Sequence, residues 1–229
     1  MTFTAVIFDL FGTLVDDFRS SAGGMDTELA VALAVQYEPF MCLWRESLEM
    51  RALGTFQTIE ASIEHVCGAM GVRVEVEQMK MAVEIRLRYT RQALKPRPDA
   101  EMTLVQLKHE GYKIGLISNC SIEIPILWPE TQFADLVESP IFSSRAGLKK
   151  PDPRIYHLAC EYLDVMPERC LYIADGENHE LTAAAKEGMH SVLIRTSSQE
   201  TRSKLHQEAR EWQGPSIDSL KDVLQLVGP

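Results

Sequence analysis

The chain has 229 residues, of which 45% are hydrophobic, and a formal net charge of -10. This length suits one core domain with an insertion, and the hydrophobic share can bury a substantial core. The net negative charge argues against non-specific binding to nucleic acid or to an anionic membrane surface, but a locally positive site can still take a small anionic substrate.

Targeting and redox features predict a cytoplasmic protein. No apolar run approaches the roughly 18 residues that span a bilayer, and Met1–Thr4 lacks the basic segment of a secretory signal. The five cysteines form no Cys-x-x-Cys pair, and most stand in apolar stretches. They are therefore predicted to be buried free thiols in a reducing compartment.

Short apolar runs alternate with helical patterns along most of the chain. The predicted strands are Ala5–Phe8, Lys113–Ile117, Cys170–Ala174 and Ser191–Ile194, with a weaker one at Ile141-Phe142. The helical patterns between them are Asp99–Glu110, Pro153–Leu163 and Glu177–Glu187. This alternation predicts an α/β fold with a doubly wound parallel sheet, which binds ligands at the carboxyl ends of its strands.

An all-helical insertion is expected directly after the first strand. Its helical patterns are Leu29–Gln36, Pro39–Leu53, Ile59–Met70 and Val76–Leu94. We expect residues 1–15 and 96–229 to form the core, with residues 16–95 as a cap over the strand ends and Pro96–Pro98 as the return hinge. The final stretch, Ser216–Val227, reads as a closing turn and helix.

Asp9 ends the first apolar run and is followed by a turn with Gly12 and Thr13. A carboxylate at this position can attack a substrate above the sheet, and the amides of such a turn, Gly12 included, can hold anionic oxygens. Taken alone, however, an Asp after a strand is as well explained as a helix cap.

Two further segments carry polar residues after the second strand. Ser118 could donate a hydrogen bond to a substrate oxygen, although a lone serine here is more often a helix N-cap. Lys150 precedes Pro151, which biases its backbone to an extended geometry and would fix a positive charge. The neighbouring Lys149 is expected to be solvated.

Asp175 follows the third strand of the core, and Glu180 stands five residues later. Two acids facing Asp9 would repel each other unless a cation lies between them, and a few oxygen ligands suit Mg²⁺. The alternative is acidic capping of the helix that follows, which stabilises by roughly 0.3–1 kcal/mol. His179 is a weak candidate ligand that we expect at the surface.

Together the four segments resemble the motifs of the haloacid dehalogenase (HAD) superfamily. The matching pieces are Asp9 with Gly12-Thr13, Ser118 after a strand, Lys150-Pro151-Asp152-Pro153, and Asp175-Gly176 with an acid farther on.

The resemblance implies a Rossmann-like core with a helical cap, and a role for each motif residue. Asp9 would be a covalent nucleophile supported by Thr13. Ser118 would bind the transferred group, and Lys150 would neutralise charge. Mg²⁺ would be held by Asp9, Asp175, the carbonyl of Phe11 and, as an open question, Glu180.

Phe11 is the main departure from the family's phosphatases. These enzymes usually carry a second Asp there, which protonates the leaving oxygen and contributes about 10²–10⁴-fold. The family's 2-haloacid dehalogenases have an aromatic residue instead, because halide leaves without a proton.

The chain also resembles those dehalogenases in Trp44-Arg45, in Ser118-Asn119, and in Lys150 with Tyr156. Arg45 and Asn119 would then cradle halide. Yet those enzymes need no metal and have serine where Asp175 stands.

The acids Asp175 and Glu180 favour a Mg²⁺-dependent phosphatase of a small anionic ester. The first alternative is a 2-haloacid dehalogenase, and the second is a weakly active or non-catalytic ligand-binding homologue. As partners we expect only a small anionic substrate, with no nucleic acid and no membrane, in a monomer or homodimer.

Overall fold

The computed structural model describes residues 2–17, 24–195 and 207–228. Its centre is a parallel six-stranded sheet in the order β3-β2-β1-β4-β5-β6, which confirms the predicted α/β class. The strands are β1 (Ala5–Phe8), β2 (Lys113–Ser118), β3 (Ser139–Phe142), β4 (Cys170–Ala174), β5 (His190–Ile194) and β6 (Ser216–Ile217).

The central strand β1 is apolar throughout because both faces of the sheet are covered. Val6 and Phe8 pack into a core with α7 (Ala100–His109) and α13 (Val223–Val227). Ala5 and Ile7 pack into a second core on the other face. The helices that cover this second face are α10 (Pro153–Leu163), α11 (Glu180–Lys186) and α12 (Gln207–Glu211).

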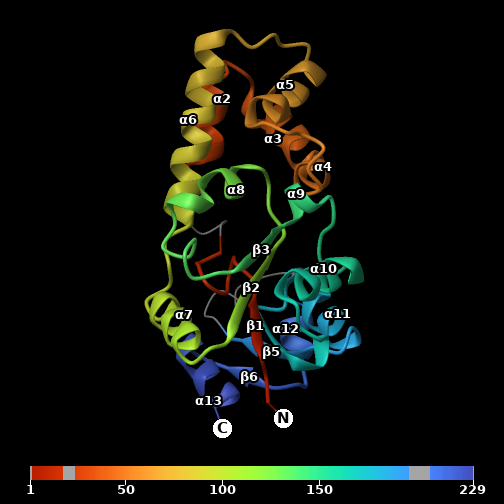
Figure 1. The fold of residues 1–229 in the computed structure, drawn as a ribbon. Helices are drawn as coiled ribbons and strands as arrows, with labels where there is room; N and C mark the ends of the chain where they lie inside the picture. Colours follow the sequence, from red (N-terminus) through yellow and green to blue (C-terminus); the bar gives the residue numbers. More distant parts are fainter. Residues whose placement is uncertain (1, 18–23, 196–206, 229) are drawn as a thin grey trace.

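Among the described residues, the helices α2 to α6, which lie between β1 and β2, form what we call the cap. They are α2 (Met25–Ala32), α3 (Tyr37–Glu46), α4 (Leu48–Ala52), α5 (Ile59–Ala69) and α6 (Val76–Ala93). Figure 1 shows them above the end of the sheet toward which β1 runs from the N-terminus. The cap has its own hydrophobic core, which includes Leu29, Phe40 and Ile63. The boundaries of 16–95 for a separate domain stay a prediction.

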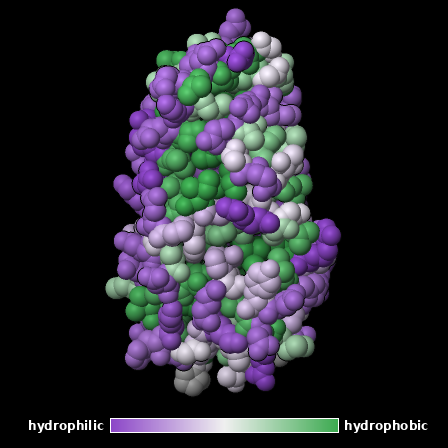
Figure 2. All heavy atoms as spheres, turned by 45° about the horizontal axis from the view of Figure 1, so that its top comes forward, coloured by the Kyte–Doolittle hydropathy of each residue, from purple (hydrophilic) through white to green (hydrophobic). Residues whose placement is uncertain are grey.

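The surface of the molecule mixes hydrophilic and apolar side chains. Figure 2 shows apolar residues in both the upper and the lower half of the face it presents, with hydrophilic ones between and around them. Within the cap, Val31, Leu48 and Val76 are exposed. No described helix combines the length and the apolar character that a membrane crossing requires.

Several expected elements differ from those observed. The pattern Pro39–Leu53 forms two helices, α3 and α4, that meet at Ser47. The helix expected from Glu177 begins only at Glu180, because Asn178 and His179 adopt left-handed backbone angles.

Other short elements were not expected. At the carboxyl-terminal end, β6 precedes the closing helix where only a turn was predicted. The additional helical segments are α8 (Glu123–Leu127), α9 (Ser143–Ala146) and 3₁₀ turns at Trp128–Glu130, Pro167–Arg169, Glu177–His179 and Leu220–Asp222.

The cysteines are free thiols, as predicted, but their burial differs. Cys67, Cys120, Cys160 and Cys170 are buried, whereas Cys42 is exposed. The exposure of Cys42 follows from its place on the outer face of α3, beside the exposed Glu46.

Candidate active site

The four predicted segments meet at the carboxyl edge of the sheet. Asp9 follows β1, Ser118 ends β2 and Asp175 follows β4, and these three strands are neighbours. Lys150 reaches the same place from the loop after α9 and contacts Asp9 directly. Each of these four side chains is buried.

Asp9 is held by a hydroxyl on one oxygen and an ammonium on the other. Thr13 Oγ1 donates to Asp9 Oδ2 at 3.1 Å, and Lys150 Nζ donates to Asp9 Oδ1 at 2.5 Å. Burial raises the pKa of Asp9 to about 6, although Lys150 acts in the opposite direction. The carboxylate form of Asp9 is favoured by the charge and hydrogen bond of Lys150 and by a backbone hydrogen bond from Leu10.

Lys150 is fixed at both its backbone and its side chain. Asn119 Nδ2 donates to the carbonyl of Lys150 at 2.9 Å, and the amide of Lys150 donates to Asn119 Oδ1 at 2.8 Å. The Nζ atom lies 2.5 Å from Glu180 Oε2 as well as from Asp9. Burial opposes the charged form, yet Asp9 and Glu180 outweigh it and raise the pKa of Lys150 above its ordinary value.

Both carboxylate oxygens of Glu180 have protein donors. Oε2 accepts from Lys150 and, at 2.9 Å, from Tyr172 OH, while Oε1 accepts from the amide of Glu177 at 3.2 Å. Tyr156 OH donates to the carbonyl of Glu180 at 3.1 Å. Burial raises the pKa of Glu180 to about 7, against the effect of Lys150. Because both of its carboxylate oxygens already accept hydrogen bonds, Glu180 positions Lys150 and is less available to bind a cation.

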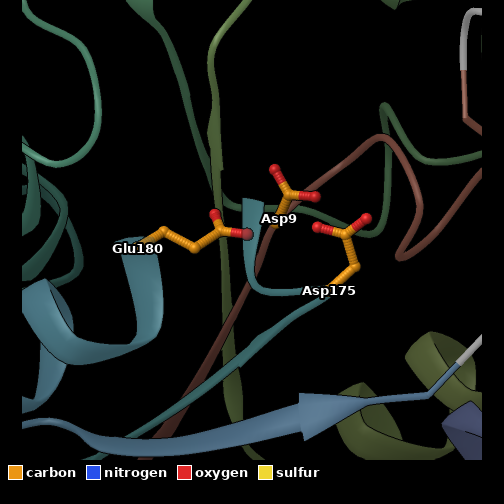
Figure 3. A group of neighbouring side chains, drawn as sticks. All are labelled: Asp9, Asp175 and Glu180. Carbon is orange, nitrogen blue, oxygen red and sulfur yellow. The ribbon is translucent and has the colours of Figure 1, made fainter. Parts of the chain in front are cut away.

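Asp9, Asp175 and Glu180 form a buried acidic cluster. Figure 3 shows their carboxyl groups turned toward one another from three segments. One ligand oxygen from each lies within 4.8 Å of the others. Three acids face a single buried lysine, so the described cluster carries an excess of negative charge when ionised.

This donor set fits a divalent cation such as Mg²⁺, which prefers oxygen ligands. Asp9 and Asp175 are the residues that would hold it, because Glu180 is already engaged by Lys150 and Tyr172. Gly12, with φ of +80°, lets the loop approach: a Cβ atom there would lie 2.1 Å from Asp175 Oδ2. Only glycine permits this closeness.

A cavity of about 670 Å³ lies between the core and the cap. From the core it is lined by Asp9, Phe11, Asn119, Lys150 and Glu180, among others. The cap contributes further lining residues, which include Met41, Trp44, Arg45, Arg51, Arg86 and Thr90. The insertion thus closes the space above the acidic cluster, as the sequence predicted for a cap.

The predicted substrate-binding residues are not all placed alike. Phe11 and Arg45 line the cavity, with Arg45 exposed on α3. Asn119 lines it too, but its carboxamide is occupied with the backbone of Lys150. Tyr156 is fully buried beneath the site and contacts the backbone of Glu180, so the structure does not bring it into the cavity. We therefore assign Tyr156 a positioning role instead of the substrate contact that we expected.

Three other predictions concern a hydroxyl, a lysine and a histidine. Ser118 Oγ is fully buried beside the thiol of Cys120 and is not among the residues that line the cavity, so its role as a contact to the transferred group stays a prediction. Lys149 is partly exposed and pairs with Glu49 of the cap, rather than being simply solvated. His179 is exposed, as expected.

Two buried cap arginines were missed by the sequence reasoning. Arg86 shares the buried face of α6 with Ala82, Ile85 and Thr90, and Arg51 is the buried residue of α4. The helical periodicity of the sequence already indicated the burial of Arg86, because Arg86 follows Ala82 by four residues and so lies on the same apolar face. A charge at such a position is rare unless it has a partner or a ligand.

Comparison with known proteins gives the same family. Residues 3–188 match the model of the haloacid dehalogenase-like hydrolases. The (S)-2-haloacid dehalogenase 4A of Burkholderia cepacia is 27% identical over 83% of this chain and 82% of its own. The phosphoglycolate phosphatase of Shigella boydii is 27% identical over 97% of this chain and 92% of its own.

Other relatives share a smaller part of their length. The rhythmically expressed gene 2 protein of Drosophila melanogaster is 34% identical, but the match spans 41% of this chain and only 37% of that protein. Among solved structures, a 2-haloacid dehalogenase from Pseudomonas syringae has a TM-score of 0.74 at 19% identity, covering 99% of this chain and 98% of that one. That likeness shows the shared fold. With a family match over most of its length, the chain belongs to the haloacid dehalogenase-like hydrolases.

Proposed function

We infer that the protein is a Mg²⁺-dependent hydrolase of a small phosphate ester that acts through an aspartyl intermediate. The observation that carries this proposal is the acidic cluster of Asp9, Asp175 and Glu180, buried around a single lysine. Asp175 Oδ1 accepts a hydrogen bond from the amide of Glu177 at 3.1 Å. A second acid beside Asp9 also hinders ionisation of the nucleophile, and a cation between the two would offset this effect.

Asp9 is the nucleophile in this proposal. One of its carboxylate oxygens would form a bond to phosphorus while the ester oxygen of the substrate departs. Water would then attack the phosphorus, release phosphate and return Asp9 to its carboxylate. Thr13 and Lys150, which each contact one oxygen of Asp9, hold the carboxylate in place for attack.

Positive charge around the phosphoryl group comes from Lys150 and from the cation. Lys150 stays an ammonium because Asp9 and Glu180 both favour its charged form. Its position is fixed by Asn119 and Glu180, so little reorganisation accompanies the reaction. A bound Mg²⁺ would neutralise charge on the phosphoryl oxygens and offset the repulsion between Asp9 and Asp175.

Phe11 sets a limit on the substrates. It lies two residues after Asp9, lines the cavity and packs against the core, where it can neither give nor take a proton. The leaving oxygen therefore has no carboxylic acid from this position. Esters whose leaving group is a weak base should react fastest.

A 2-haloacid dehalogenase is the second candidate. It is favoured by Phe11, since halide needs no proton, and by the likeness to the B. cepacia dehalogenase over 83% of this chain. In that reaction Asp9 would attack carbon and halide would leave, and water would then hydrolyse the aspartyl ester. This alternative gives Asp175 no part in the chemistry and leaves it only its hydrogen bond from the amide of Glu177.

A paired screen tests the proposal. Phosphate esters and 2-haloacids would each be assayed with Mg²⁺ and with a chelator, using the parent protein and Asp9→Asn. The proposal expects phosphate release that needs both Mg²⁺ and Asp9. Halide release from a 2-haloacid without metal, together with no phosphate release, would move the assignment to the dehalogenase.

A further inference from the structure

We propose that the cap end of the cavity is a subsite for a second anionic group of the substrate, a carboxylate or a phosphate, held by Arg51 and Arg86. The reacting phosphoryl group would occupy the other end, beside Asp9. The inference rests on the proposed function for the identity of that reacting group. It adds the chemical class of the rest of the substrate.

Arg51 has no ion-pair partner at the cap end among the described residues, although Asp26 lines the same cavity. Arg51 and Arg86 are 8% and 2% exposed, and both line the cavity. Arg86 pairs with Glu123 at 2.5 Å. Within the described ranges, no carboxylate lies within ion-pairing distance of Arg51. Burying a charge is costly unless it is paired, so this end of the cavity favours an incoming anion.

The pKa of Arg51 reflects its burial beside a second guanidinium group. Burial, followed by the like charge of Arg86, lowers the pKa of Arg51 to about 10. Glu123 and Asp26 act in the opposite direction without restoring it. An anion between the two guanidinium groups would relieve both effects, because it would favour the charged form of each.

The two guanidinium groups are held against one indole ring. Arg51 Nε donates to Ser47 Oγ at 3.2 Å, and a terminal nitrogen donates to the carbonyl of Trp44 at 2.9 Å. The Cζ atoms of Arg51 and Arg86 lie 4.1 and 5.0 Å from the Trp44 ring centroid. Among the described residues, Arg86 Nη1 donates only to the sulfur of Met25 at 3.5 Å, a weak acceptor. Guanidinium groups fixed in this way can donate paired hydrogen bonds to the oxygens of a carboxylate or a phosphate.

Thr90 gives an independent indication of a ligand. Its hydroxyl is buried and lacks a hydrogen-bond partner anywhere in the described chain. Thr90 lines the same cavity and follows Arg86 by four residues on α6, so the two lie on one face of the helix. A buried hydroxyl left without a partner is unfavourable, and an anionic oxygen would accept its proton.

The two ends of the cavity therefore have opposite character. The core end gathers Asp9, Asp175 and Glu180 and suits a cation with a phosphoryl group. The cap end instead presents the guanidinium groups of Arg51 and Arg86. A small phosphate ester that carries a second anionic group can satisfy both ends. The volume of about 670 Å³ leaves room for such a molecule.

Binding to the full-length Asp9→Asn protein tests the subsite without turnover. In the presence of Mg²⁺, calorimetry would compare phosphate monoesters of ω-hydroxy carboxylic acids in a series of increasing chain length. The carboxylic acid esters form the first anionic arm of the experiment. Diol monophosphates of equal length, which end in a neutral hydroxyl, form the neutral arm, and the corresponding diol bisphosphates form the second anionic arm. For one length, an anionic arm should bind at least about tenfold tighter than the neutral arm, equivalent to about 1.4 kcal/mol. The stronger anionic arm identifies the group as carboxylate or phosphate.

Variants assign the preference to the arginines. In the Asp9→Asn background, Arg51→Met should remove most of the tenfold ratio, Arg51→Lys should restore part of it, and Thr90→Val should lower it to a smaller extent. Arg88→Met is the matched control, since Arg88 is on α6 but is exposed and paired with Glu28. Its ratio should equal that of the background protein.

The binding ratios decide whether the cap end holds an anionic group. Equal binding of anionic and neutral arms, or no binding of either, overturns it, as does a ratio that Arg51→Met leaves unchanged. If Arg51→Met does not fold, the ratios of the background protein and of Thr90→Val decide. Anionic preference without hydrolysis by the parent would sink the phosphatase proposal and leave the subsite, whereas hydrolysis without preference would do the reverse.

Discussion

The side-chain carboxamide of Asn119 forms two hydrogen bonds with the backbone of Lys150. The carboxamide nitrogen donates to the Lys150 carbonyl at 2.9 Å, and the Lys150 amide donates to the carboxamide oxygen at 2.8 Å. The residue after β2 thereby positions a lysine 31 residues away in the chain. The ammonium group of that lysine then reaches Asp9.

Asn119→Ala should lower kcat on p-nitrophenyl phosphate with Mg²⁺ far more than it changes KM. Without the two hydrogen bonds, the backbone of Lys150 is free to shift, and a displacement of about 1 Å can cost about 10²-fold in rate. Steady-state kinetics measures the split, and thermal melting checks the fold. An unchanged kcat in a folded variant would show that Asn119 does not position Lys150.

Phe11→Asp should flatten the dependence of rate on the leaving group. The parent protein should hydrolyse aryl phosphates of acidic phenols much faster than alkyl phosphates, because Phe11 gives no proton to the departing oxygen. A carboxylic acid at this position should raise the alkyl rate by about 10²-fold or more, within the range of general acid catalysis. Phe11→Leu is the control for lost aromatic packing. If folded Phe11→Asp kept the alkyl-to-aryl ratio of the parent, protonation would not be what limits the enzyme.

Asp175→Asn and Glu180→Gln should separate metal binding from the positioning of Lys150. We expect Asp175→Asn to lower Mg²⁺ affinity and phosphatase rate together. Glu180→Gln should lower the rate but should weaken Mg²⁺ binding less than Asp175→Asn does. The loss of affinity should not exceed the roughly 10–100-fold that is typical of residues that support a metal ligand without binding the metal. Titration calorimetry and rate measurements would give both quantities. Equal losses of affinity would mean that Glu180 binds the metal directly.

Glu123 should make stability fall in acid. Burial acts to raise its pKa, but Arg86 and nearby donors outweigh burial and hold that pKa below the ordinary 4.5. A carboxyl group with a lowered pKa adds stability that is present above its unfolded value and is lost as the pH falls through the folded value. The unfolding free energy, measured in urea, should therefore decrease as the pH drops below 4.5.

Glu123→Gln should remove this part of the pH dependence and destabilise the fold by about 3–5 kcal/mol near neutral pH, because Arg86 stays buried without its partner. Glu130→Gln is the matched control. It breaks the exposed pair of Arg91 and Glu130, which should cost at most about 1 kcal/mol. Equal effects of the two variants would contradict the importance of the buried pair between α6 and α8.

The core fold could be predicted because its strands are buried on both faces and so are continuously apolar, as in Ala5–Phe8. Polar residues at the strand ends then pointed to one edge of the sheet, where Asp9, Lys150 and Asp175 would meet. The structure brings these three side chains together with Glu180, while Ser118 ends the neighbouring strand β2. The pattern was weaker for β6, which has only two residues.

Other features depend on contacts that a linear pattern does not contain. The delayed start of α11 follows from left-handed angles at Asn178 and His179. The hydrogen bonds between Asn119 and Lys150 join residues from separate loops. Trp44 was recognised, but its role as the surface on which Arg51 and Arg86 both lie needs three cap segments in space.

The central claim is that Asp9 becomes phosphorylated, and acid-quenched mass spectrometry tests it most directly. The protein would be mixed with excess p-nitrophenyl phosphate and Mg²⁺, quenched within a turnover and digested. We predict a phosphoryl group on the peptide that contains Asp9, absent when Mg²⁺ is chelated and absent in Asp9→Asn. Phosphate release without any modification of that peptide would contradict the account, as would a metal-independent ester of Asp9 formed from 2-chloropropionate in its place.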